Sequence, residues 1–171
     1  MAPNGGDGGT LQGTARWQPV SLPFRAYLYA LQGYFIEITF TAFYDLIEGT
    51  GNLKLRGYTS VWSLFIYSVA SLVMERINAF LQPRGVPLLV RAAAHALWMY
   101  AWEFTTGCML SRVDACLWDY KNYRYNIAGL VTLEYAPLWF LLGVIFEVVY
   151  APNIGRIAWV QHAEVSQKKA C

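Results

Sequence analysis

Four long apolar stretches, separated by short polar links, dominate the pattern of the chain. They cover residues 24–46, 61–81, 87–109 and 127–150. A helix needs about 20 apolar residues to cross a ~30 Å hydrocarbon layer, and each stretch is that long. The alternating segments of about ten residues that build membrane β-barrels do not occur in the sequence. The pattern therefore predicts an all-α polytopic membrane protein, a bundle of four transmembrane helices.

Glycine and proline mark the limits of these segments. Residues 1–23 are rich in glycine and predict a disordered head, without the apolar run of a cleaved signal peptide. Residues 83–86 form a link short enough to make the second and third helices an antiparallel pair. Pro152 closes the fourth segment and begins a polar tail over 151–171. The expected organisation is thus head, four-helix domain over 24–150, and tail.

Composition agrees with a membrane protein and excludes other classes. Apolar residues make up 56% of the chain and charged residues 14%, against roughly 45–50% and about 25% in soluble domains. The lipid bilayer is therefore the expected partner, and a net charge of +2 gives no sign of nucleic-acid binding. Three cysteines are too few for a disulfide scaffold. A bond between Cys108 and Cys116, at the far end of the third segment, is left open.

The distribution of lysine and arginine predicts the orientation in the membrane. The head, the second link and the tail, together with the segment ends next to them, hold eight basic residues: Arg16, Arg25, Arg76, Arg84, Arg91, Arg156, Lys168 and Lys169. The first and third links hold five: Lys54, Arg56, Arg112, Lys121 and Arg124. Both termini are therefore expected in the cytosol. Lys168 and Lys169 resemble a dilysine retrieval signal, which would bind coat protein and keep the protein in the endoplasmic reticulum or the early secretory pathway.

An internal repeat connects the two halves of the chain. A shift of 66 positions places five residues of the first segment on identical residues of the third: Ala30 on Ala96, Leu31 on Leu97, Tyr34 on Tyr100, Glu37 on Glu103, and Thr39 on Thr105. A shift of 72 places Glu75 on Glu147. The two shifts predict a parallel 2+2 arrangement, which is one of the architectures of transporters.

Five glutamates fall within the apolar segments: Glu37, Glu75, Glu103, Glu134 and Glu147. A charge at the bilayer centre costs at least about 2.5–3.5 kcal/mol, so these residues need partners or a function. Arg76 and Arg91 are the structural cations expected near the cytosolic ends, where their side chains can reach water. His95 shares a helical face with Arg91 and Glu103, which leaves open either a core histidine or a proton relay.

Polar side chains recur every four residues, so each helix presents one polar face. The series along the second, third and fourth segments are Ser63, Tyr67, Ser71 and Glu75; Arg91, His95, Met99 and Glu103; and Tyr135, Trp139, Gly143 and Glu147. We expect these faces to meet in an interior polar seam. Pro137 would free the Leu133 carbonyl beside Glu134 and could supply another oxygen ligand.

Within that seam the five glutamates have different expected roles. Glu37 and Glu103 are the expected central ligands, with Glu134 beside them, and Glu75 and Glu147 lie toward the cytosolic mouth. His95 completes the candidate ligand- or ion-binding residues. The alternative is that all of these groups only hold the bundle together through interhelical hydrogen bonds.

Several short runs carry a resemblance to a known family. They include Gly33-Tyr34-Phe35, Thr59-Ser60-Val61-Trp62, Trp118-Asp119-Tyr120, Thr132-Leu133-Glu134-Tyr135-Ala136 and, most specifically, Trp102-Glu103-Phe104-Thr105-Thr106-Gly107. Over residues 24–150 the chain resembles the transmembrane protein 229 family, closest to its B form, within the wider CmpB-like group labelled "putative ABC-transporter type IV". The resemblance implies a multi-pass four-helix protein. It supplies no substrate, cofactor or catalytic residue.

These observations favour a small transporter or permease-like component that moves a proton, a cation or a small polar solute. The second hypothesis is a structural or adaptor subunit that docks a membrane partner, or a second copy, through the small-residue face of Ala92 and Ala96. A lipid-modifying enzyme is the third, and it is disfavoured because phosphate-loop, zinc and nucleophile-elbow motifs do not occur in the sequence. No metal, cofactor or catalytic residue is predicted.

Overall fold

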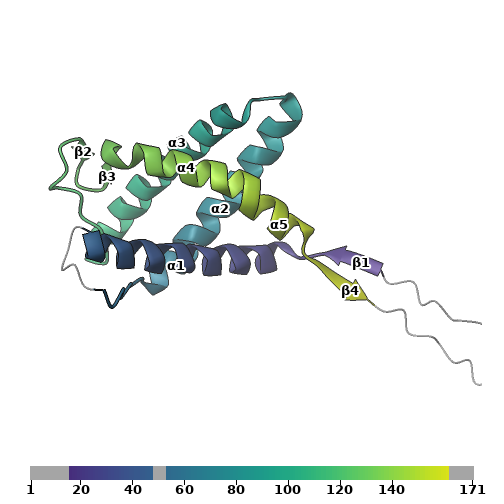
Figure 1. Ribbon diagram of the computed structural model, residues 1–171, viewed down its shortest axis with the longest axis horizontal. Helices are drawn as coiled ribbons and strands as arrows, with labels where there is room; N and C mark the ends of the chain where they lie inside the picture. Colours follow the sequence, from purple (N-terminus) through teal and green to yellow (C-terminus); the bar gives the residue numbers. More distant parts are fainter. Residues whose placement is uncertain (1–15, 48–52, 162–171) are drawn as a thin grey trace, which may run out of the picture.

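The computed structural model describes residues 16–47 and 53–161, and most of them are helical (Figure 1). The long helices are α1 (Leu22–Ile47), α2 (Val61–Leu81) and α3 (Leu88–Ser111). The last helical rod consists of α4 (Ala136–Ile145), the π-helical turn η3 (Phe146–Tyr150) and α5 (Ala151–Arg156). The predicted all-α class is therefore confirmed as a mainly helical fold.

The helices form two antiparallel pairs. The pair of α1 and α2 is called the first hairpin here, and the pair of α3 with α4 and η3 is the second hairpin. Between the hairpins, α2 continues into the 3-10 turn η1 (Gln82–Arg84), which contains the proline of the predicted short link. Gly85 then takes a φ of 69°, a left-handed conformation that suits glycine, and α3 begins three residues later. The link therefore reverses the chain as the sequence predicted.

A small antiparallel sheet joins the two ends of the described chain, which leave the same side of the molecule in Figure 1. Strand β1 (Arg16–Pro19) pairs with β4 (Ala158–Gln161), so that Trp17 faces Val160 and Gln18 faces Trp159. The expected disorder of the whole head over 1–23 is therefore wrong for residues 16–23. Trp17 in β1 and Trp159 and Val160 in β4 are residue types that favour strands. The glycines that suggested disorder lie outside the described residues.

The fourth segment begins later than its apolar pattern predicted. Ile127 belongs to a short hairpin of β2 (Asn126–Ile127) and β3 (Val131–Thr132), followed by the 3-10 turn η2 (Leu133–Tyr135). Ala128 and Gly129 take positive φ values of 55° and 70° and turn the chain between the strands. Pro137 consequently lies in the first turn of α4, where it helps to begin the helix. The predicted helix break at Pro137 is corrected.

The buried core is small and the exposed apolar surface is large. The core cluster consists of Tyr29, Ala70, Met74, Met99, Phe146 and Ile154. Two helical stretches, Val61–Arg84 and Leu133–Arg156, are long and apolar enough to cross a membrane, and only 17% and 22% of their most apolar windows are buried. The core helix of a soluble protein would be mostly buried. Exposed rings such as Phe35 and Phe65 extend this apolar surface, which supports membrane association.

Candidate functional site

An ion pair at one end of the first hairpin involves a glutamate that the sequence singled out. Arg25 of α1 pairs with Oε1 of Glu75 on α2. The Tyr29 hydroxyl donates a hydrogen bond of 3.0 Å to the other carboxylate oxygen, Oε2. Both oxygens of Glu75 are therefore satisfied, and its side chain keeps about a quarter of its surface exposed. The three residues form a polar clamp between α1 and α2, although Nε of Arg25 is buried without a hydrogen-bond partner among the described residues.

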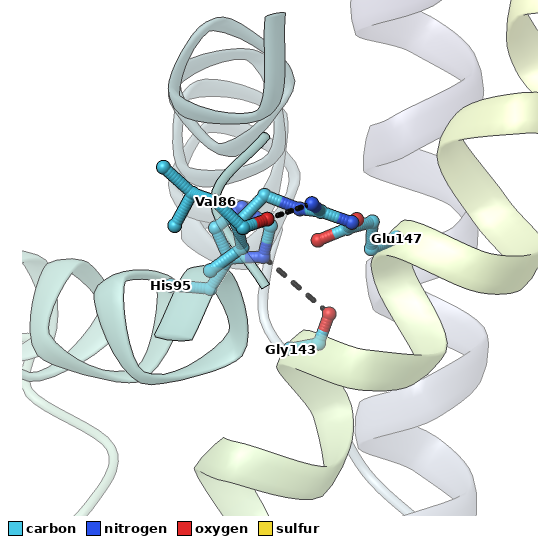
Figure 2. Close-up of polar contacts among 5 residues, drawn as sticks. Val86, His95, Gly143 and Glu147 are labelled. Carbon is cyan, nitrogen blue, oxygen red and sulfur yellow. Dashed lines mark hydrogen bonds and ion pairs between the residues drawn. The ribbon is translucent and has the colours of Figure 1, made fainter. Parts of the chain in front are cut away.

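The second hairpin has an ion pair of the same kind, and it is more deeply buried. Nε of Arg91 on α3 donates a hydrogen bond of 2.6 Å to Oε1 of Glu147 in η3, and another guanidinium nitrogen donates to the Val86 carbonyl (Figure 2). The Glu147 side chain keeps only 5% of its surface exposed. Oε2 of Glu147 is buried and has no hydrogen-bond partner among the described residues.

His95 lies beside this second ion pair and is completely buried. Its Nδ1 is 3.4 Å from the carbonyl oxygen of Gly143 on α4, as Figure 2 shows. A carbonyl oxygen only accepts, so this contact places the proton of the neutral ring on Nδ1. Nε2 is then a buried acceptor, and it has no partner in the part of the chain that the structure describes. Arg91, His95 and Glu147 are called the second clamp below, and Arg25, Tyr29 and Glu75 the first clamp.

A separate group of polar side chains takes one residue from each long helix. Glu37 of α1 and Glu103 of α3 both interact electrostatically with the Tyr67 hydroxyl on α2. Trp139 of α4 interacts with the Glu103 carboxyl. We call Glu37, Tyr67, Glu103 and Trp139 the central cluster. It brings together the two glutamates that the sequence proposed as central ligands.

The central cluster is only partly satisfied. Thr59 donates to Glu37 at 2.6 Å, and Tyr120 donates to Oε1 of Glu103 at 2.9 Å. Oε2 of Glu103 and Nε1 of Trp139 are both buried, and neither completes a hydrogen bond within the described ranges. The Trp139 indole nevertheless interacts with the Glu103 carboxyl as a donor, so these two groups face each other. The cluster therefore brings two carboxylates, those of Glu37 and Glu103, together around one tyrosine hydroxyl.

Glu134 has a different environment from the other four glutamates. It is exposed, and its carboxylate accepts hydrogen bonds from the Thr132 hydroxyl and, at 3.1 Å, from the Tyr125 backbone N–H. These contacts tie the β2–β3 hairpin to the start of the last helical rod. Arg76, expected as a structural cation, is an exposed residue of α2. Among the described residues, Arg91 and Arg25 form ion pairs with helix glutamates.

Sequence reasoning missed the partners that lie outside the four-residue series. Arg25, at the start of the first segment, was considered only as one of the basic residues on the cytosolic side, and Thr59 and Tyr120 belong to links. Burial of the Tyr120 ring, reinforced by the Glu103 carboxylate, raises the pKa of its hydroxyl, which therefore remains a neutral donor. The only sequence signal for Arg25 was its position 66 residues before Arg91, the shift that defines the repeat.

The small-residue face of α3 is used inside the chain. Ala92 is completely buried and Ala96 is 9% exposed. A Cβ atom added to Gly143 of α4 would come within 3.0 Å of the Ala92 carbonyl oxygen. The close approach that was expected for a partner helix is therefore made by α4, which leaves this face unavailable to a second chain.

A polar cleft of about 270 Å³ lies where α3 meets the β2–β3 loop. Its lining residues are Ser111, Asp114, Cys116, Trp118, Asp119, Lys121, Ala128, Gly129 and Leu130. Cys108 and Cys116 are free thiols, and the Cys116 thiol contacts the Trp118 carbonyl at 3.4 Å. Within the described ranges, no three His, Cys, Asp or Glu side chains are placed to hold a metal ion.

Fold and polar sites together define a mainly helical, membrane-associated protein with paired and unpaired carboxylates between its helices. A family model described as "Putative ABC-transporter type IV" matches residues 24–168, and the chain belongs to this family. The match covers all the described helices except the first two residues of α1. No solved structure matches the chain.

Proposed function

We propose that the chain crosses the membrane four times, through α1, α2, α3 and the rod of α4, η3 and α5. The two most apolar stretches already have the required length and exposure. Helices α1 and α3 contain 26 and 24 residues, which at about 1.5 Å per residue exceeds the ~30 Å hydrocarbon layer. Their charged residues face other helices through the clamps and the central cluster, so a lipid-facing apolar surface remains.

We also propose that the two hairpins are a parallel 2+2 repeat. The shift of 66 that relates Glu37 to Glu103 also relates Arg25 to Arg91, and the shift of 72 relates Glu75 to Glu147. Each hairpin thus forms its ion pair from residues at corresponding positions. The same shift of 72 relates Tyr67 to Trp139 within the central cluster. An accidental likeness between sequences would not be expected to place interacting partners at matching positions.

We propose that the protein is a small transporter or permease-like component, with the central cluster as its intramembrane site. The observation that carries this proposal is that the carboxylates of Glu37 and Glu103 meet around Tyr67 in a cluster that takes one residue from each of α1, α2, α3 and α4. Carboxylates that meet at a repeat interface suit a proton or a small cation. The first and second clamps then act as structural ties rather than as ligands.

Flux measurements in reconstituted vesicles test this proposal. The full chain is placed in liposomes that contain a pH-sensitive dye, and dissipation of an imposed pH gradient is followed, with sodium and potassium gradients as parallel arms. The double substitution Glu37→Gln and Glu103→Gln should reduce the flux by about tenfold or more, because it removes both carboxylates. Glu134→Gln is the matched control, since that side chain is exposed and bonded within the β2–β3 hairpin. Flux that the double substitution leaves unchanged would contradict the proposal.

A folded wild-type protein without flux in any of the three arms would favour the adaptor hypothesis over transport. Both hypotheses agree with a closer membership in the transmembrane protein 229 family, which we propose from the runs around Trp102–Gly107 and Thr132–Ala136. The flux measurement therefore distinguishes transport from an adaptor role, and it does not test the family membership.

For its location, we propose the endoplasmic reticulum, with both termini in the cytosol. Support comes from the eight-to-five distribution of basic residues and from Lys168 and Lys169, which lie outside the described residues. In cells, replacing both lysines by alanine should move a tagged protein to later compartments by releasing it from coat protein. Protease protection of both tags in intact microsomes would contradict the proposed orientation.

A further inference from the structure

Besides its deeper burial, the second clamp differs from the first in the residue at the position of the tyrosine donor. In the first clamp, the Tyr29 hydroxyl supplies a donor to Oε2 of Glu75. The residue 66 positions later is His95, whose ring proton is already used at the Gly143 carbonyl. Oε2 of Glu147 and Nε2 of His95 are therefore two buried acceptors in one clamp.

Two unpartnered acceptors can be satisfied by a single added proton. Protonated at Nε2, the imidazole becomes a donor at both nitrogens, and Oε2 of Glu147 is the free acceptor of the same clamp. No covalent bond needs to break, and the proton comes from solvent. A local adjustment is available because Glu147 lies in a π-helical turn, a rare element that often accompanies functional sites.

We propose that Arg91, His95 and Glu147 form a proton-binding site, separate from the central cluster, whose occupied state shares Glu147 between Arg91 and protonated His95. The unpaired atoms belong to two residues that are 0% and 7% exposed, so solvent does not satisfy them. The first clamp needs no added proton, because the Tyr29 hydroxyl already donates a hydrogen bond to Glu75.

The charged and titratable surroundings of His95 are few. Burial is the largest effect and disfavours a charged imidazole, and Arg91 on the same helix also opposes a second positive charge. The hydrogen bond to Gly143 and the charge of Glu147 favour the protonated ring. Helix α4 presents the Gly143 carbonyl. From α1, Tyr29 lies across the Phe146 ring, whose centroid is 5.7 Å from the rings of both Tyr29 and His95. Glu147 is thus the charged group that offsets the cost of burial when His95 is protonated.

Nitrogen-15 NMR of labelled histidine tests the proposal directly. The chain contains two histidines, so His162→Gln leaves His95 as the only source of signal. In the full chain, the Nε2 resonance should move from its neutral to its protonated position between about pH 8 and pH 5. Adding Glu147→Gln should shift this midpoint to lower pH by about one unit or more, because the attracting charge is lost. Glu75→Gln, the matched change in the first clamp, should leave it in place.

A His95 signal that stays neutral down to pH 5 in the folded protein would overturn the proposal, as would a midpoint that Glu147→Gln does not move. If Glu147→Gln does not fold, His95→Gln provides a second measurement. Its amide can donate to Glu147 without an added proton, so the change in Tm of wild-type protein between pH 8 and pH 5 should become smaller in this variant. An equal pH dependence in both proteins would also contradict the proposal. Neither measurement depends on whether the protein transports anything.

Discussion

Each hairpin contains an arginine–glutamate ion pair, but the surroundings of the two pairs differ. We interpret the first pair as a structural contact and the second as part of a proton-binding site. In the first clamp, Glu75 is half-buried and both of its oxygens are bonded. In the second, Glu147 is buried, one of its oxygens is unpaired, and a histidine stands where the first clamp has Tyr29. In the repeat that we propose, the ion pair serves stability in the first half and is modified for proton binding in the second.

Removing the arginine from each clamp should produce the largest effects and the clearest contrast. Arg91→Ala leaves the Glu147 charge buried without a partner, and we expect Tm in detergent to fall by roughly 10 °C. Arg25→Ala leaves Glu75 with the Tyr29 hydroxyl and some access to water, so we expect a fall of about 3 °C. Arg91→Lys, which keeps the charge, is the control. Equal losses for the two alanine variants would show that the clamps do not differ in burial or in bonding.

The close contacts between the helices of each hairpin offer a second comparison. A Cβ atom on Gly33 would lie 2.2 Å from Cβ of Tyr67, whereas one on Gly143 would meet the Ala92 carbonyl oxygen at 3.0 Å. Gly33→Ala must therefore separate α1 from α2, and we expect Tm to fall by about 6 °C. Gly143→Ala needs a shift of only a few tenths of an ångström, with a fall of about 2 °C. Thermal unfolding in the same detergent measures both, and the reverse order would contradict the packing described.

The links at the far ends of the hairpins should differ in their response to pH. In the second hairpin, the Lys121 backbone N–H donates to Asp119 at 3.0 Å and its ammonium lies 3.1 Å away, which lowers the pKa of that carboxyl. In the first hairpin, the Tyr58 N–H donates to the uncharged Thr41 hydroxyl at 2.9 Å. Of these two hydrogen bonds, only the one in the second link has an acceptor that titrates, namely the Asp119 carboxylate.

The folded-state pKa of Asp119 is below its ordinary value. The ionised carboxylate therefore stabilises the folded protein fully at pH values above the ordinary pKa, and this contribution is lost as the pH falls through the folded-state pKa. Asp119→Asn should lower Tm by about 1 °C at pH 7, and the difference from wild type should shrink as the pH falls below about 4. Thr41→Val should lower Tm by an amount that stays constant over the same range of pH. A constant difference for Asp119→Asn would show that its charge makes no contribution.

The helices could be predicted from the sequence because each is a long apolar run. The bounds of α2 agree with the predicted residues 61–81, and those of α1 and α3 differ from prediction by one or two residues. The start of the fourth helix was wrong because residues 127–132 are as apolar as a helix while Ala128 and Gly129 turn the chain. Average hydropathy does not detect a turn, whereas backbone conformation does.

For the candidate sites, a spacing of four residues grouped Glu75, Glu103 and Glu147 with other residues of their own segments but could not identify the partner across the interface. Glu75 and Glu147 have the same place in their series, yet only the structure shows that Tyr29 completes one clamp and that the other lacks a donor. Glu134 matched the other glutamates by composition, although its contacts lie in an exposed hairpin.

The sequence by itself determined the apolar runs, the polar residues that interrupt them and the two shifts that relate the halves of the chain, because these depend only on order and spacing. The tertiary structure decided which carboxylates are paired, which oxygens are left without donors, and that the alanine face of α3 is filled by α4. Hydrogen bonds and ion pairs act over a few ångströms, so they depend on how the helices pack against one another, and helical periodicity leaves that packing open.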